Sequence, residues 1–134
     1  IMMMRTLGAA TLIWAVVLGA FIFPLPVTAD GVGEQVVRGF YEALADGDGD
    51  RAVIFISPSK RMAKNYKAKA LEEYYGQMNE PLRLRSLERI GDNEYRVQYY
   101  FRGHGLTCNG DSTIYLESSS QGTFIEKIVA HGRC

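Results

Sequence analysis

The sequence lacks the short motifs by which many enzymes and nucleotide-binding proteins are first recognised. It has no glycine-rich phosphate loop, no Gly-x-Ser-x-Gly nucleophile turn and no ligand spacing typical of zinc. It also has no excess of one charge, because 15 basic and 15 acidic residues balance among 134. We therefore expect no cofactor, no metal and no nucleic-acid partner, and one small domain without internal repeats.

Long apolar runs are scarce, and the one that occurs lies at the start of the sequence. Residues 7–23 carry no charge and are followed by a Pro-Leu-Pro break and by small residues that end at Ala29. This pattern predicts a signal peptide over 1–29, cleaved after Ala29, and a periplasmic or secreted domain over 30–134. An uncleaved anchor is the alternative, because a spanning helix needs about 20 residues. Either way, this segment is the expected membrane contact.

Cysteine is also rare. Only Cys108 and Cys134 are present, with no Cys-x-x-Cys pair of the redox-active kind. In an oxidising compartment an even pair favours a disulfide over a metal site or a catalytic thiol. The bond would close a loop of about 27 residues and stabilise the fold by about 3 to 4 kcal/mol on the chain-entropy model.

The residues after the signal segment first follow a helical period and then an alternating one. Apolar residues recur at helical spacing over 36–44, and a second helix is expected over 51–56, with Asp50 as its N-cap. A looser helical region spans 59–78. Strands are then expected over 82–89, 94–102, 112–117 and 123–131. This order predicts an α+β fold in which N-terminal helices pack on a curved antiparallel sheet.

Three aspartates at alternate positions, Asp46, Asp48 and Asp50, imitate the start of a calcium-binding loop. A helix-loop-helix calcium site also needs a glycine six positions into the loop and a glutamate at the twelfth. Those positions hold Arg51 and Ser57. The sequence therefore favours helix capping over metal binding.

The stretch "VVRGFYEALADGDGDRAVIFISPSKR", residues 36–61, resembles the nuclear transport factor 2-like superfamily. Its first helix with Phe-Tyr, its Gly-Asp turn and its second helix ending in Ser-Pro stand in the order found there, and the resemblance extends over 31–134. It implies a cone-shaped α+β fold with an apolar pocket between the helices and the concave sheet face. Members include ketosteroid-isomerase-like and polyketide-cyclase-like enzymes, and exported members that act as binding or assembly modules.

The resemblance gives the aromatic residues a candidate role. The ring side chains that could line such a pocket, or else fill the core, are Phe40, Tyr41, Phe55, Tyr75, Tyr99 and Tyr115. A basic run could either be a solvated surface or bind an anionic polymer or lipid, and it comprises Lys60, Arg61, Lys64, Lys67 and Lys69.

The expected function is that of an exported, non-catalytic binding or accessory module of a bacterial envelope. Its partner would be a small apolar ligand or an envelope protein, and a homodimer through the sheet is a further alternative. A small pocket enzyme of the ketosteroid-isomerase-like or polyketide-cyclase-like type is the rival hypothesis. It is weaker, because neither His104 nor His131 has a recognisable orienting carboxylate and no acid is clearly placed in the pocket.

Overall fold

The computed structural model describes residues 29–132 and residue 134. Residues 1–28 lie outside the described part, so the signal peptide and its cleavage stay predictions. Within the described part, no helix is long and apolar enough to cross a membrane.

The described chain runs through helical elements first and through the sheet afterwards. The helical elements are α2 (Ala29–Ala45), α3 (Gly49–Val53), the 3-10 turns η2 (Pro58–Lys60) and η3 (Lys64–Tyr66), and α4 (Ala68–Tyr75). The strands are β1 (Glu80–Gly91), β2 (Glu94–Gly103), β3 (Leu106–Ser119) and β4 (Gly122–Ala130). They pair antiparallel as neighbours in chain order, forming one four-stranded sheet. The predicted α+β class is confirmed.

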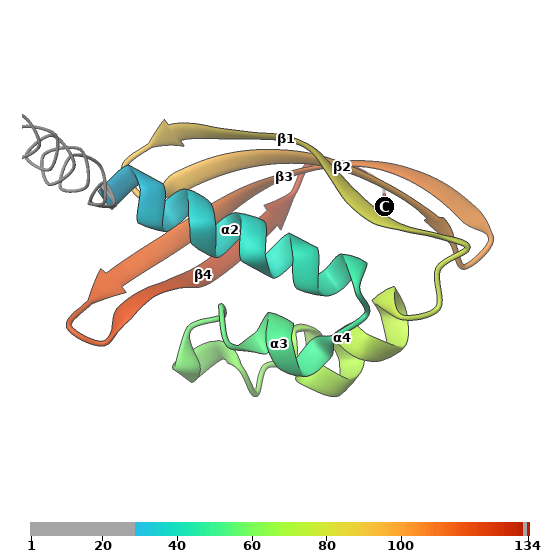
Figure 1. The fold of residues 1–134 in the computed structure, drawn as a ribbon, viewed down its shortest axis with the longest axis horizontal. Helices are drawn as coiled ribbons and strands as arrows, with labels where there is room; N and C mark the ends of the chain where they lie inside the picture. Colours follow the sequence, from blue (N-terminus) through green and yellow to red (C-terminus); the bar gives the residue numbers. More distant parts are fainter. Residues whose placement is uncertain (1–28, 133) are drawn as a thin grey trace, which may run out of the picture.

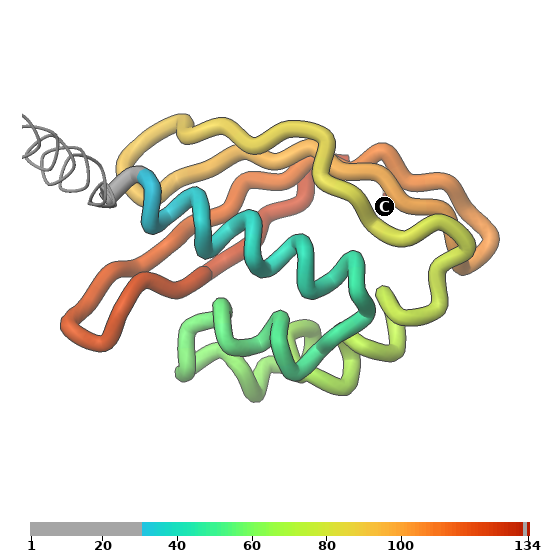
Figure 2. The backbone as a smooth tube through the Cα atoms, in the orientation of Figure 1, coloured from blue at the N-terminus to red at the C-terminus, as the bar shows by residue number. Residues whose placement is uncertain are grey.

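The sheet arches over the helices, which lie against its concave side (Figure 1). Helix α2 packs across the sheet through one buried face. Val37, Phe40 and Leu44 recur on that face at helical spacing. The last residue of α2 is Ala45, and Gly47 follows with a φ of 66°, the left-handed conformation that glycine takes without strain. Helices α3 and α4 then pack beside the C-terminal end of α2, as the backbone trace shows (Figure 2).

The second helix differs from its sequence prediction. It begins after Asp48, whose side chain accepts a 3.0 Å hydrogen bond from the backbone N–H of Arg51, so the N-cap is Asp48 and not Asp50. It also ends at Val53 instead of residue 56. The reason is that the following residues pair with β4: Ser57 N–H donates to the Ile125 carbonyl, and Ile125 N–H to the Phe55 carbonyl.

This pairing covers part of the outer edge of β4, which would otherwise offer unpaired backbone groups to another chain. Beside it, the ladder between β3 and β4 shifts register between Tyr115 and Leu116.

The third predicted helix, over 59–78, is also corrected: η2 and η3 precede a shorter α4. All four strands include the ranges predicted for them, apart from His131, and β3 begins well before its predicted start, at Leu106.

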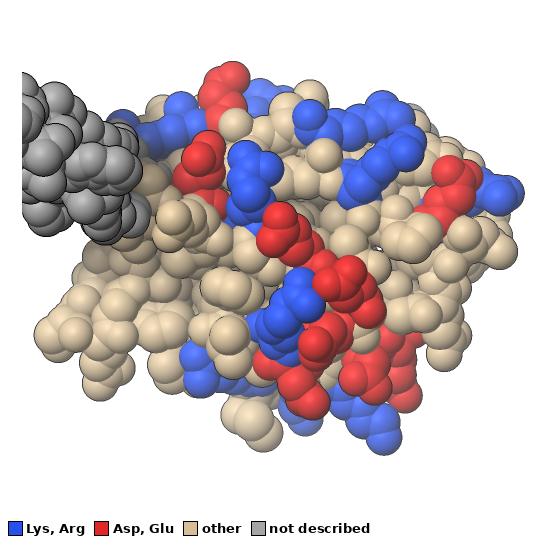
Figure 3. Space-filling model, in the orientation of Figure 1, with Lys and Arg blue, Asp and Glu red and all other residues tan. Residues whose placement is uncertain are grey.

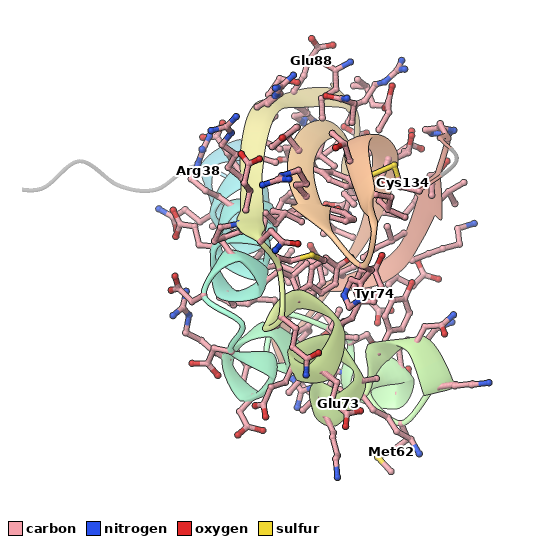
Figure 4. The ribbon with its side chains drawn as sticks, turned by 90° about the vertical axis from the view of Figure 1, so that its right-hand side faces the viewer. Arg38, Met62, Glu73, Tyr74, Glu88 and Cys134 are labelled. Atoms are coloured by element: carbon pink, nitrogen blue, oxygen red, sulfur yellow. A yellow bond between two sulfur atoms is a disulfide. The ribbon has the colours of Figure 1, made fainter. Side chains whose placement is uncertain are left out.

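The predicted disulfide is confirmed. Cys108 lies in β3 opposite Phe101 and is fully buried, and it is bonded to Cys134 across 26 positions of sequence. The bond holds Cys134, which follows β4, against the sheet. Figure 4 shows Cys134 at this side of the sheet, beside the yellow sulfur–sulfur bond.

Candidate functional site

A hollow of about 520 Å³ lies between the helical layer and the concave face of the sheet. Its polar lining residues are Tyr41, Lys64, Asn65, Tyr66, Tyr74, Tyr75, Tyr99 and Ser112. The remaining lining residues are Phe40, Leu44, Ala70, Leu71, Ile128, Ala130 and Cys134. We call this space the tyrosine hollow, because five tyrosines line it. Its volume lies in the range of about 300 to 1,000 Å³ that is usual for small-molecule sites.

The sheet side of the tyrosine hollow is built on a stack of rings. Tyr99 of β2 stacks on Tyr41 of α2 with ring centroids 5.6 Å apart, and on Phe101 at 6.4 Å. The Tyr99 hydroxyl lies 3.5 Å from the Oγ atom of Ser112, a β3 residue that is 1% exposed. Alternation along β2 therefore points Tyr99 inward and leaves Tyr100 on the outer face.

The helical side is built from η3 and α4. The Tyr66 hydroxyl accepts a 3.2 Å hydrogen bond from the backbone N–H of Ile128, which fastens η3 to β4. On α4, Tyr74 and Tyr75 pack edge to face at 4.9 Å. Figure 4 shows Tyr74 directed from α4 toward the sheet and Glu73 directed away from it. The His104 ring stacks on Tyr74 at 4.3 Å, and its Nε2 atom lies 2.8 Å from the Tyr74 carbonyl oxygen.

Two phenols of the tyrosine hollow, those of Tyr41 and Tyr75, are held in their neutral form. Burial raises the pKa of Tyr41 well above its usual value, and the neighbouring Tyr99 and Tyr75 add to the shift. Burial likewise raises the pKa of Tyr75, with smaller contributions from Tyr99 and Tyr74. These side chains can therefore donate hydrogen bonds across the physiological pH range, but they do not supply a phenolate base.

None of the described lining residues has a carboxylate or imidazole side chain. His131 lies outside the lining, with its Nε2 atom 2.6 Å from the Thr113 hydroxyl oxygen. Asp111 likewise lies outside the lining, where it accepts two hydrogen bonds from Arg96, at 3.0 and 2.6 Å. The arrangement offers donors and aromatic surface to a ligand.

Four of the six aromatic residues predicted for the pocket come together in the tyrosine hollow: Phe40, Tyr41, Tyr75 and Tyr99. The other two, Phe55 and Tyr115, do not line it. Phe55 packs against Gly39 of α2, where an added Cβ would lie 2.6 Å from its ring. Tyr115 is covered by Lys127, whose Nζ atom lies 4.7 Å from the ring centroid.

The sequence interpretation missed Tyr66 and Tyr74. Tyr66 stands in a 3-10 turn, which has no helical period to reveal its direction. Tyr74 stands three positions after the buried Leu71 on α4, and this helical spacing was the signal that could have found it. Ser112 alternates in phase with Ile114 on β3, and this period of two places it inward.

The predicted basic run divides into two kinds of side chain. Arg61 serves the fold, because its Nε and Nη2 atoms donate to the carbonyls of Ile56 and Ile54 at 3.0 and 3.2 Å. Lys64 is exposed and lines the tyrosine hollow. Lys60, Lys67 and Lys69 are exposed and do not line it.

The outer face of the sheet carries its own group of charges. Arg83 and Arg85 lie over the Tyr100 ring at 4.8 and 5.0 Å, and Arg102 donates to Glu80 at 2.7 Å. Hydrogen bonds from Arg102 and Tyr100 lower the pKa of Glu80. Figure 3 shows Lys and Arg side chains along β1, and Asp and Glu side chains gathered near α3. These outer contacts are separate from the tyrosine hollow.

The fold has counterparts among solved structures. A protein of unknown function with a cystatin-like fold from Methylobium petroleophilum PM1 is 12% identical, with a TM-score of 0.62 over 81% of this chain and 82% of that one. An NTF-2-like protein of unknown function from Shewanella oneidensis MR-1 is 15% identical, with a TM-score of 0.50 over 72% and 93%. No protein-family model matches the chain, and neither does any curated protein sequence.

At such identities the similarity concerns the fold alone. Both neighbours have cone-like α+β folds, and this chain has helices followed by a four-stranded, curved antiparallel sheet of the same class. Fold does not carry function between such distant proteins, so function has to be argued from the tyrosine hollow.

Proposed function

We propose that the protein is an exported, non-catalytic binding module of the nuclear transport factor 2-like superfamily that holds a small molecule in the tyrosine hollow. The observation that carries the proposal is the hollow itself, a space of about 520 Å³ lined by five tyrosines and by apolar side chains. Such a lining buries an apolar ligand, while a few polar groups orient it.

The chemistry of the lining supports binding over catalysis. Proton abstraction beside a carbonyl needs a base within reach and a donor for the developing oxyanion. The phenols supply donors, but the described lining residues include no carboxylate or imidazole side chain to act as the base. The high pKa values of Tyr41 and Tyr75 also weigh against phenolate chemistry near neutral pH.

The disulfide supports the exported part of the proposal, because such bonds persist mainly in oxidising compartments. Export is tested by expressing the full chain in a bacterial host and measuring the intact mass of the periplasmic protein. We expect the mass of residues 30–134 less two hydrogen atoms, because the signal peptide is cleaved after Ala29 and one disulfide forms. A cytoplasmic protein with free thiols would contradict the exported assignment.

Binding is tested by filling the tyrosine hollow. Ala70 of α4 lines it, whereas the neighbouring Lys69 is exposed and does not. We expect native mass spectrometry and an apolar fluorescent dye to detect binding by the unmodified protein and by Lys69→Trp. Binding should be lost in Ala70→Trp, because the indole occupies the space. Equal dye binding by Ala70→Trp would refute the proposed site.

A further inference from the structure

We infer that the tyrosine hollow takes an aromatic monocarboxylate, with its ring among the tyrosines and its acid group toward Lys64. This inference rests on the proposed function and narrows it to one chemical class of ligand. Two features of the lining carry it. One is the placement of the rings, and the other is that the polar groups available to a ligand are a positive charge and neutral hydrogen-bond donors.

The rings favour a flat ligand. On one side of the tyrosine hollow, Tyr41 and Tyr99 are stacked with an interplanar angle of 28°. On the other side, Tyr74 and Tyr75 meet edge to face at 76°. Aromatic groups attract one another both by stacking and edge to face, and all four of these rings belong to the lining that a planar ligand would meet. A saturated chain of equal size would gain apolar burial but not these contacts.

The charge of the lining favours an anion. Lys64 is the one charged side chain among the described lining residues, and it forms no ion pair with any described residue. An ammonium without a partner attracts a carboxylate and repels an amine. No side chain in the described lining is a carboxylate, so no side chain there would balance the charge of a cationic ligand.

The hydrogen-bonding groups of the lining also favour an anionic ligand. The Tyr75 hydroxyl has no hydrogen-bond partner among the described residues, and its raised pKa keeps the proton on the oxygen. Asn65, which has a side-chain amide, is a residue of the same lining. Neutral donors and an ammonium suit a ligand that accepts hydrogen bonds through a charged oxygen.

Three probes of one shape test the inference: 2-naphthoate, 2-naphthamide and 2-naphthylmethylammonium. They present the same ring with a negative, a neutral and a positive group. By isothermal titration calorimetry at low salt, we expect the acid to bind on the order of tenfold more tightly than the amide. The amine should bind most weakly of the three.

Two variants and a matched control assign the preference to residues. Lys64→Gln should remove the advantage of the acid over the amide and leave amide binding unchanged. Lys67→Gln should keep the advantage, because Lys67 lies on the same segment without lining the tyrosine hollow. Tyr75→Phe should weaken the acid and the amide together by several fold, since the hydroxyl donates to either oxygen.

Each result decides between the inference and the proposed function. If the amide or the amine binds as tightly as the acid, or if Lys64→Gln keeps the preference, the ligand class is wrong and the site stands. If the apolar dye binds but none of the three probes does, the inference fails alone. If neither dye nor probes bind to the folded protein, the proposed function fails as well.

Discussion

Tyr99 and Gly110 are register partners across β2 and β3, and the Tyr99 ring occupies the space that a side chain on residue 110 would fill. A Cβ atom there would lie 2.1 Å from the ring. The missing side chain lets Tyr99 lie on the sheet and stack against Tyr41. Gly110 thereby shapes the floor of the tyrosine hollow, although it does not line it.

The first prediction concerns Gly110→Ala. The added methyl group should displace the Tyr99 ring, lower the free energy of unfolding by about 1 to 3 kcal/mol and weaken dye binding. Urea unfolding and dye titration measure the two effects. Gly91→Ala is the control, because the nearest atom to its Cβ would lie 3.5 Å away, an ordinary contact. A Gly110→Ala protein with unchanged stability and binding would show that Tyr99 is not held as described.

The order of elements could be predicted from the sequence because it depends on local periods. Helical spacing marks α2, and alternation marks the strands and the hairpin between β1 and β2. The start of α3 could not be fixed in the same way. Asp48 and Asp50 are equally good capping residues by type, and the path of the backbone decides which one reaches the free N–H groups.

The site was predictable only where a regular element carries it. The helical spacing of α2 and α4 points Tyr41 and Tyr75 inward, and the alternation of β2 puts Tyr99 on the face opposite Tyr100. Phe55 comes after α3 has ended, in the segment that pairs with β4, so helical spacing gives the wrong direction for it. Tyr115 belongs to a regular strand, but its direction depends on which sheet face is inward, which alternation alone cannot tell.

The second prediction separates the two candidate caps. Asp48→Ala should lower the free energy of unfolding by about 1 kcal/mol, because it leaves the Arg51 N–H without its acceptor. Asp50→Ala, two positions on, should cost only a few tenths of a kcal/mol from the lost charge near the helix N-terminus. Denaturant midpoints of the two variants measure the difference. If Asp50→Ala proved less stable than Asp48→Ala, Asp50 would be the N-cap.

The third prediction concerns pH and the pair formed by Arg96 and Asp111. The two hydrogen bonds from Arg96 lower the pKa of Asp111, so its folded-state pKa lies below its value in the unfolded chain, about 3.9. The stability from this pair is therefore present above pH 3.9 and is lost as the pH falls below it.

Asp111→Asn should accordingly be less stable than the unmodified protein at pH 7, and the gap should close between about pH 4 and pH 2. Asp92→Asn is the control, because that carboxylate is fully exposed in the β1–β2 turn, where its ion pair with Arg89 contributes little to stability. Thermal or urea unfolding across this pH range provides the measurement. A stability gap that stays constant down to pH 2 would mean that the ion pair does not produce the acid dependence.

The fourth prediction links the disulfide to the tyrosine hollow. Cys134 lines the hollow and is held there by its bond to the buried Cys108. Reduction should lower the free energy of unfolding by about 3.5 kcal/mol, the chain-entropy value for a loop of this length. It should also weaken dye binding, because the segment after β4 is released from one wall of the hollow.

The double variant Cys108→Ala, Cys134→Ala separates these effects from side reactions of the reductant. It should match the reduced protein in urea midpoint and in dye affinity, and it should not respond to further reductant. Since Tyr66 still fastens η3 to β4 through the Ile128 N–H, we expect the hollow to persist in a looser form. A reduced protein with full dye affinity would show that Cys134 borders the hollow without shaping it. A reduced protein with an unchanged urea midpoint would show that the disulfide does not stabilise the fold.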